Sequence, residues 1–297
     1  MGVFSVRGAF TALVTPFTRD GSEIDWGAYE RLVESQIDGG IAGLVPCGTT
    51  GEAPTLSDAE QRALVKRTVE IAAGRAVVMA GTGSFSTKKT IEASKAALEA
   101  GADAVMIVMP YYSKPSQDGL VRHVELCAKA VGAPVVLYNI PGRSGVDLGL
   151  EATLRILESC PNVVGIKDAT GNVLRCQELT RAAGERLAIL SGDDALTLPM
   201  MSVGAQGVIS VTSNVVPKPV ADCVADALAG RFSQARALHL RLLPVHSVLF
   251  IEPNPAPAKA ALAEMGRAND TVRPPLVEAT PACRAKVMEA LRGFGAA

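Results

Sequence analysis

This sequence of 297 residues has few histidines and few aromatic residues, and its net charge is close to zero. Its three histidines never fall in the His-Glu-x-x-His spacing of zinc proteases, so we expect no metal site. The six cysteines contain no Cys-x-x-Cys pair, which in a chain of this length is typical of buried thiols in a reducing compartment. The formal net charge of −1 gives no electrostatic footprint for nucleic acid or for an anionic membrane.

Long hydrophobic runs are absent as well. No stretch approaches the roughly 18 uninterrupted apolar residues of a membrane span, and the longest runs, such as Ala104–Met109, have the length of a core strand. The N-terminal residues have no apolar core of signal-peptide length. Since 48% of the residues are hydrophobic, the chain can still bury a large core. We therefore expect a cytoplasmic protein without a membrane segment.

Short apolar runs alternate with amphipathic stretches over the first 230 residues. The eight expected strands are Phe10–Thr15, Gly43–Pro46, Ala76–Ala80, Ala104–Met109, Pro134–Tyr138, Val163–Ile166, Leu187–Leu190 and Gly207–Val211. The helices expected after them are Asp25–Gln36, Ser57–Ala73, Thr87–Ala100, Ser116–Val131, Leu148–Ser159, Val173–Ala183, Asp194–Val203 and Pro217–Ala229. Strands that are apolar throughout are typical of a sheet covered by helices on both faces. Eight such units predict an α/β protein with a closed (β/α)₈ TIM barrel over residues 1–230.

The remaining residues, 231–297, contain no strand pattern. Helical periodicity recurs in Phe232–Leu249, Ala256–Met265 and Pro281–Leu291, and prolines cluster in the connections between them. The sequence thus predicts a small C-terminal all-helical appendix to the barrel.

Lys167 is the sharpest single candidate for catalysis. It ends the sixth expected strand on the inward pleat face, together with Val163 and Gly165, while Asp168 lies on the opposite face. Burying a lysine inside a barrel disfavours its cation, and a neutral amine is the nucleophile that attacks carbonyls to form a Schiff base. The alternatives are a lysine that pairs with Asp168 or one that reaches solvent over the rim.

Other polar residues follow neighbouring strands, where the active site of a barrel forms. Near a Schiff-base lysine, the Tyr138 phenol could shuttle protons and the Arg143 guanidinium could clamp a carboxylate. Taken alone, a tyrosine at this position is more often a packing residue at a strand end, and such an arginine is more often a surface residue. The loop Gly48–Glu52 offers hydroxyls and backbone N–H groups, and its Glu52 could be a general acid. Asp193-Asp194 is better explained as a helix N-cap than as a metal site.

Seven segments together resemble the dihydrodipicolinate synthase family of pyruvate-dependent class I aldolases. These segments are GTTGE (Gly48–Glu52), PYYSKPSQDGL (Pro110–Leu120), YNIPGRSG (Tyr138–Gly145), GIKDATGN (Gly165–Asn172), SGDD (Ser191–Asp194), GVISVTSN (Gly207–Asn214) and EPNPAPAK (Glu252–Lys259). The match keeps order and spacing from about residue 8 to residue 266. The resemblance implies a barrel enzyme that condenses pyruvate with L-aspartate 4-semialdehyde, without a metal or organic cofactor, as a homotetramer of two tight dimers.

The resemblance also implies roles for individual residues. Lys167 matches the lysine that forms an imine with pyruvate, and Tyr138 matches the tyrosine that shuttles protons. Thr49 matches the hydroxyl that bridges this tyrosine to a second one, matched by Tyr112, which in the family reaches in from a neighbouring subunit. The implied binding residues are Thr50 for the pyruvate carboxylate, Arg143 for the carboxylate of the second substrate, and Gly192 and Ile209 for the lysine's pocket.

Three positions depart from members of the family that are inhibited by lysine. Where those members carry a histidine, an asparagine and a glutamate in the allosteric pocket, this sequence has Gln61, Phe85 and Lys89, so we expect weak feedback control. Sister families that act on sugar-derived or hydroxyproline-derived 2-keto acids keep the lysine and the tyrosine but generally lack Arg143. A sister aldolase of this kind is the alternative function, and a non-catalytic barrel that binds small acids is a third.

Overall fold

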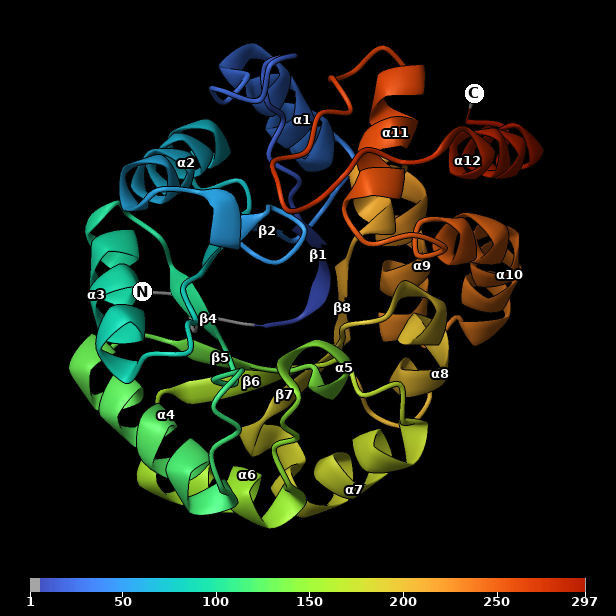
Figure 1. Ribbon diagram of the computed structural model, residues 1–297. Coiled ribbons are helices and arrows are strands. Elements are labelled where there is room, and N and C mark those ends of the chain that lie inside the picture. Colours follow the sequence, from blue (N-terminus) through green and yellow to red (C-terminus); the bar gives the residue numbers. More distant parts are fainter. Residues whose placement is uncertain (1–5, 297) are drawn as a thin grey trace.

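The computed structural model describes residues 6–296, in which eight parallel strands close into a barrel surrounded by helices (Figure 1). The strands are β1 (Gly8–Ala12), β2 (Gly43–Val45), β3 (Val77–Gly81), β4 (Ala104–Val108), β5 (Val135–Asn139), β6 (Val163–Asp168), β7 (Ala188–Ser191) and β8 (Gly207–Ser210). Each strand pairs with the next, and β1 also pairs with β8, with Gly8 opposite Gly207. The predicted TIM barrel is confirmed.

Helices follow every strand. The α-helices are α1 (Trp26–Asp38), α2 (Asp58–Ala72), α3 (Thr87–Glu99), α4 (Gln117–Val131), α5 (Pro141–Ser144), α6 (Leu150–Ser159), α7 (Val173–Ala183), α8 (Thr197–Met201), α9 (Pro217–Leu228), α10 (Phe232–Val248), α11 (Ala256–Glu264) and α12 (Pro281–Phe294). Short 3₁₀ helices are η1 (Ala53–Thr55), η2 (Gly184–Arg186), η3 (Asp194–Leu196) and η4 (Thr212–Asn214). Most predicted bounds agree with these to within two or three residues.

Two differences from the predicted helices have local causes. The expected helix Asp194–Val203 is divided into η3 and α8, because Pro199 would clash with a helical carbonyl four residues earlier and is tolerated only in the first turn of α8. The short helix α5 was not predicted. It starts at Pro141, a favourable residue at a helix's first position, and stops at Gly145, whose φ is +70°.

Apolar side chains fill both the barrel interior and the layer between strands and helices. In the interior, Phe10 is fully buried against Gly43, where a Cβ atom would lie only 2.1 Å from the Phe10 ring. Glycine at this position therefore makes room for the aromatic ring. The six cysteines are all buried and carry free thiols.

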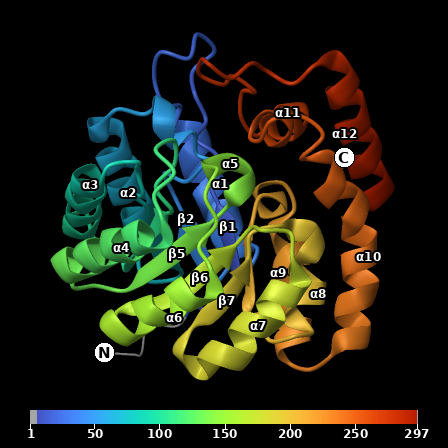
Figure 2. The ribbon, with the colours of Figure 1, turned by 60° about the horizontal axis from the view of Figure 1, so that its bottom comes forward.

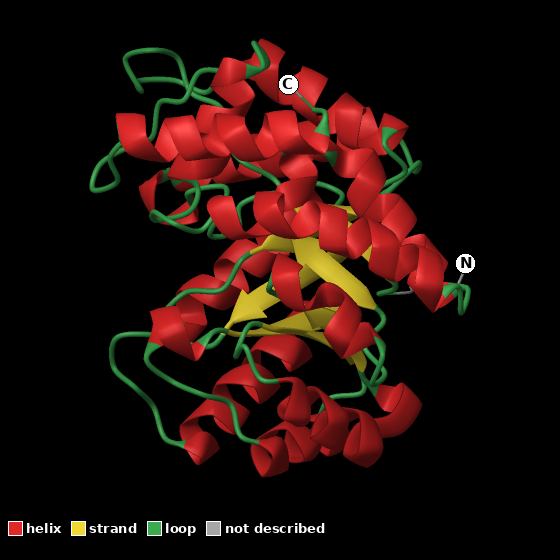
Figure 3. Ribbon diagram, turned by 90° about the vertical axis from the view of Figure 1, so that its right-hand side faces the viewer, coloured by secondary structure: helices red, strands yellow, loops and turns green. Residues whose placement is uncertain are grey.

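The C-terminal helices gather on one side of the barrel (Figure 2). Helix α10 packs against α9 and α12, and α12 also packs against α11. In the side view of Figure 3, the strands lie between helical layers above and below them. Within residues 6–296, no helix combines the length and the apolar character that crossing a membrane requires.

The buried histidine of α4 predicts a loss of stability in acid. Burial lowers the pKa of His123 to about 4, and its Nδ1 lies 2.9 Å from Thr87 Oγ1. The unfolded chain, with a histidine pKa near 6.5, binds more protons between these values, so stability is fully present above pH 6.5 and declines as the pH falls through about 4. We expect His123 to contribute up to about 3 kcal/mol of this loss.

Urea unfolding at pH 7 and pH 4 measures the effect. The variant His123→Asn should show a smaller loss of unfolding free energy over this range than the wild type. An equal pH dependence in the two proteins would contradict the prediction.

Candidate active site

Lys167 and Tyr138 lie side by side at the carboxyl ends of β6 and β5. The strand register places the two residues directly opposite each other. Lys167 is only 5% exposed and Tyr138 only 4%, and Lys167 Nζ lies 4.3 Å from the centroid of the Tyr138 ring. The structure therefore brings the amine and the phenol together inside the barrel.

Asp168 takes no part in this pair. Its carboxylate accepts hydrogen bonds from Arg175 Nε at 2.8 Å and from Thr170 Oγ1 at 2.6 Å. The two structural explanations for Lys167 thus fail, since Asp168 is paired with Arg175 and the buried lysine does not reach solvent. Lys167 remains a buried amine on the inward face of the strand.

A cavity of about 240 Å³ opens at this end of the barrel. Among the predicted site residues, Thr49, Tyr138 and Arg143 line it. Arg143 is exposed and lies on α5, directly after β5. The cavity thus places the Arg143 guanidinium and the hydroxyl groups of Thr49 and Tyr138 around one small space.

The other predicted site residues do not line this cavity. Lys167 and Ile209 are buried within the barrel, and Ile209 belongs to the same apolar cluster as Tyr138. Gly192 follows β7, where a Cβ atom would lie 2.6 Å from Ala169 Cβ. Tyr112 is 92% exposed, with a φ of +69°, so within one chain it stays outside the site.

The loop that carries Thr49 and Thr50 is tightly turned. Cys47 and Glu52 both have left-handed φ values, +57° and +56°. Thr50 is buried, and its Oγ1 accepts a hydrogen bond from Asn254 Nδ2 at 2.9 Å. In the sequence, Asn254 lies within the motif EPNPAPAK, and no local pattern indicates its contact with Thr50.

Glu52 is not placed to act as a general acid. Its side chain is buried, forms an ion pair with Lys259 and accepts the backbone N–H of Arg273 at 2.9 Å. The capping role expected for Asp193 is confirmed, since its carboxylate accepts the Ala195 N–H at 2.9 Å. Asp194 is buried and accepts from Ser210 Oγ and from the backbone of residues 211 and 212.

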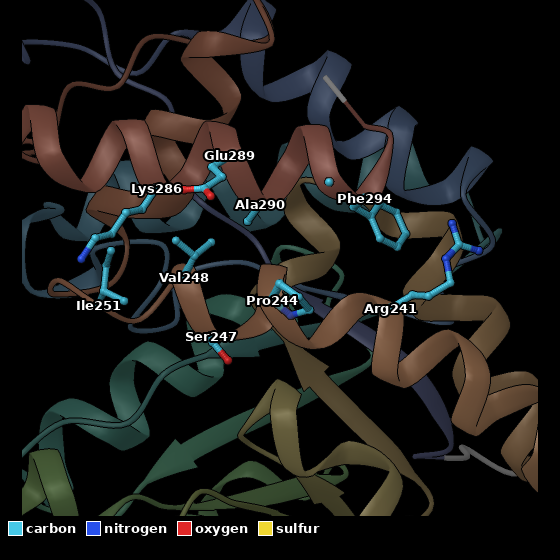
Figure 4. A pocket seen from close by; sticks show the side chains of 10 residues that line it. Arg241, Pro244, Ser247, Val248, Ile251, Lys286, Glu289, Ala290 and Phe294 are labelled. Atoms are coloured by element: carbon cyan, nitrogen blue, oxygen red, sulfur yellow. The ribbon is translucent and has the colours of Figure 1, made fainter.

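A second, larger hollow of about 500 Å³ lies between α10 and α12 (Figure 4). Arg241, Pro244, Lys286, Glu289 and Phe294 are among its lining residues. It contains none of the predicted site residues. Among residues 6–296, no group of three or more histidine, cysteine, aspartate or glutamate side chains could hold a metal ion.

The dihydrodipicolinate synthetase family model matches residues 5–293. The chain belongs to this family. A relative from Sorangium cellulosum (strain So ce56), named 4-hydroxy-tetrahydrodipicolinate synthase, is 64% identical over 98% of this chain and 97% of its own. The resemblance drawn from the sequence motifs is confirmed.

Solved structures give the same family. The 4-hydroxy-tetrahydrodipicolinate synthase from Methylacidiphilum fumariolicum SolV superposes with a TM-score of 0.96 at 46% identity, covering 98% of this chain and 96% of that one. The dihydrodipicolinate synthase from Acinetobacter baumannii, complexed with pyruvate, has a TM-score of 0.96 at 43% identity, covering 99% and 100%. Both comparisons extend over barrel and C-terminal helices alike.

The structure places the three residues at which we expect departures from lysine-inhibited members, Gln61, Phe85 and Lys89, near the loop after β2 and at the start of α3. The Gln61 amide donates to the carbonyl oxygens of Ala53 and Leu56. Phe85 is 54% exposed and packs edge-on against Tyr111, with Lys89 Nζ 6.0 Å from its centroid. The side chain of Lys89 thus places a cation beside the aromatic pair.

We expect L-lysine to inhibit this chain weakly or not at all. Lys89 would repel either ammonium group of the ligand, and Phe85 offers it no hydrogen bond, so burying those charges would be unfavourable. A dose–response curve in the synthase assay measures this. Half-inhibition below about 1 mM, an affinity of roughly −4 kcal/mol, would contradict the prediction.

Proposed function

We propose that this chain is a 4-hydroxy-tetrahydrodipicolinate synthase that condenses pyruvate with L-aspartate 4-semialdehyde through a Schiff base on Lys167. The observation that carries the proposal is the buried contact between Lys167 and Tyr138 at the carboxyl end of the barrel. The names of the relatives favour this lyase over a sister aldolase acting on other keto acids. Residues 1–230 would form the catalytic barrel, and residues 231–297 the helical appendix.

The chemistry begins with attack of the Lys167 amine on the pyruvate ketone. Loss of water gives a protonated imine, which withdraws electrons so that a methyl proton can leave and an enamine forms. The enamine carbon adds to the aldehyde of the second substrate, whose own amine then displaces Lys167 by cyclisation. The lysine is itself the electron sink, so the reaction requires neither a metal nor an organic cofactor.

The neighbouring residues handle protons and charge in this scheme. Tyr138, opposite Lys167, shuttles protons during imine and enamine formation, and Thr49 links its phenol to that of Tyr112 from a neighbouring subunit. Thr50 holds the pyruvate carboxylate, Arg143 meets the carboxylate of the aldehyde, and Gly192 and Ile209 shape the lysine's pocket. The exposure of Tyr112 on the single chain supports a site completed by a partner.

We further propose a cytoplasmic homotetramer built from two tight dimers. The buried free thiols suit a reducing compartment, and Tyr112 supports the dimer contact. Sedimentation velocity measures the assembly. A monomer with full activity would contradict the requirement for the partner's Tyr112.

Trapping with borohydride tests the proposed Schiff base. Pyruvate and sodium borohydride together should leave a reduced pyruvyl group on the single peptide that contains Lys167, because borohydride reduces the imine to a stable secondary amine. A coupled assay then offers L-aspartate 4-semialdehyde. Labelling at another lysine, or no labelling, would overturn the mechanism, and faster cleavage of a keto-sugar acid would overturn the substrate.

Arg143→Ala is expected to lower kcat/KM for the aldehyde by about ten- to a hundredfold, since a charge-assisted hydrogen bond contributes roughly 1.5–3 kcal/mol. Imine formation with pyruvate should survive, because the arginine meets the second substrate. Steady-state kinetics, with each substrate varied in turn, measures kcat/KM for the aldehyde and for pyruvate separately. The control is Arg186→Ala, which removes an exposed arginine in η2, directly before the amino end of β7, and it should behave as the wild type.

A further inference from the structure

Asn254 lies in the connection between α10 and α11 and contacts the loop Gly48–Glu52, called the substrate loop below because it carries Thr49 and Thr50. It lies 204 residues from Thr50 in the sequence, yet its Nδ2 donates to Thr50 Oγ1 at 2.9 Å, and both side chains are buried. Its Oδ1 is buried as well and finds no hydrogen-bond partner among the described residues. A buried amide that leaves one polar atom unpaired is costly, so its single contact to Thr50 calls for a functional reason.

The backbone of the loop is held by other contacts. Thr15 Oγ1 donates to the Gly51 carbonyl oxygen at 2.8 Å, and buried Glu52 is fixed by Lys259 and by the backbone N–H of Arg273. These contacts hold the residues that directly follow Thr50. The contact made by Asn254 therefore acts on the Thr50 hydroxyl rather than on the course of the loop.

The polarity of this hydrogen bond decides what the Thr50 hydroxyl can do. A hydroxyl has one hydrogen to donate and two lone pairs, whereas an amide N–H can only donate. Because Thr50 Oγ1 accepts from Asn254, its own hydrogen is free for another acceptor. A carboxylate is such an acceptor, and a hydrogen bond to it is charge-assisted.

We infer that Asn254 is a positioning residue, which fixes the Thr50 hydroxyl as a donor toward the carboxylate of pyruvate. The inference rests on the proposed function, in which Thr50 holds that carboxylate. Asn254 touches no reacting atom and acts only through Thr50. The C-terminal segment thus contributes to substrate binding in the barrel.

Two substitutions separate this role from packing. Asn254→Asp keeps the shape of the side chain but leaves it only acceptors, so the Thr50 hydroxyl would donate its hydrogen to the aspartate. The pyruvate concentration that half-saturates borohydride trapping should then rise by about tenfold or more. Asn254→Ala leaves the hydroxyl free to rotate, and the rise should be smaller, about two- to fivefold. In both variants kcat at saturating pyruvate should stay near that of the wild type. A role in packing alone predicts the reverse order, because only alanine leaves a cavity.

A double-mutant cycle adds a second measurement that stays decisive if Asn254→Asp fails to fold. In the Thr50→Val background, Asn254→Ala should leave the half-saturating pyruvate concentration unchanged, since no hydroxyl remains to be oriented. Asn162→Asp is the matched control. Its amide donates to the carbonyl oxygens of Ala128 and Ala133 beside the amino end of β6, so the change should lower Tm without altering pyruvate saturation.

The outcomes distinguish the inference from the proposed function. Failure of pyruvate to label the wild type would overturn the proposed function. If pyruvate labels the wild type, two outcomes would overturn the role of Asn254 alone. One is a pyruvate concentration at half-saturation that is unchanged in Asn254→Asp. The other is a larger rise of this concentration in Asn254→Ala than in Asn254→Asp. An undiminished effect of Asn254→Ala in the Thr50→Val background would do the same.

Discussion

Lys167→Ala should lower kcat by about 10⁴-fold or more, because it removes the group that forms the covalent intermediate. The protein should still fold, since the substitution removes a buried amine that forms no ion pair with its neighbour Asp168. The coupled synthase assay measures the loss of activity, and circular dichroism and thermal unfolding measure the fold. Borohydride should no longer attach a pyruvyl group to the protein.

The matched control for this prediction is Lys218→Ala. Lys218 is an exposed lysine that pairs with Asp222 on α9, away from the strand ends that form the site. Its removal should leave kcat and pyruvate labelling unchanged, because a surface ion pair contributes little. Turnover by Lys167→Ala within tenfold of the wild type would mean that another group carries out the chemistry.

Much of the fold was predictable because its signals are local. Apolar runs of strand length gave all eight strands. The start of α2 also carries a local signal, because Ser57 and Glu60 have the spacing of a capping box and form one in the structure. The break at Pro199 was missed because periodicity continued through it. A proline alone does not indicate a break, because Pro244 lies inside the continuous helix α10.

The positions of site residues on the strands were predictable, because the strand pattern fixes them. Pleat alternation placed Lys167 inward, and the succession of strands placed Tyr138 beside it. The partners of the substrate loop carry no such signal. Asn254 and Lys259 lie about two hundred residues from Thr50 and Glu52, and only the closed barrel with its C-terminal segment brings them together. For this reason the sequence alone suggests a general acid at Glu52, whereas the structure shows that Glu52 is half of a buried ion pair.

This buried pair predicts the largest change in stability. Lys259 and Glu52 are both almost completely buried; Lys259 Nζ also donates to the Thr271 carbonyl oxygen at 2.8 Å and lies 4.1 Å from the centroid of the Phe17 ring. Burial lowers the pKa of Lys259 to about 8, although Glu52 acts against this shift. The amine therefore remains largely protonated at neutral pH and balances the charge of the glutamate.

Lys259→Met should lower the free energy of unfolding by about 3–5 kcal/mol, because it leaves the Glu52 carboxylate buried without a counter-charge. Denaturant unfolding at pH 7 measures the loss. The double variant Glu52→Gln, Lys259→Met removes both charges and keeps an acceptor for the Arg273 N–H, so it should recover more than half of that loss. If the double variant were as unstable as the sum of the two single variants, the two side chains would contribute independently, and the ion pair would not be what holds Glu52, the last residue of the loop Gly48–Glu52, in place.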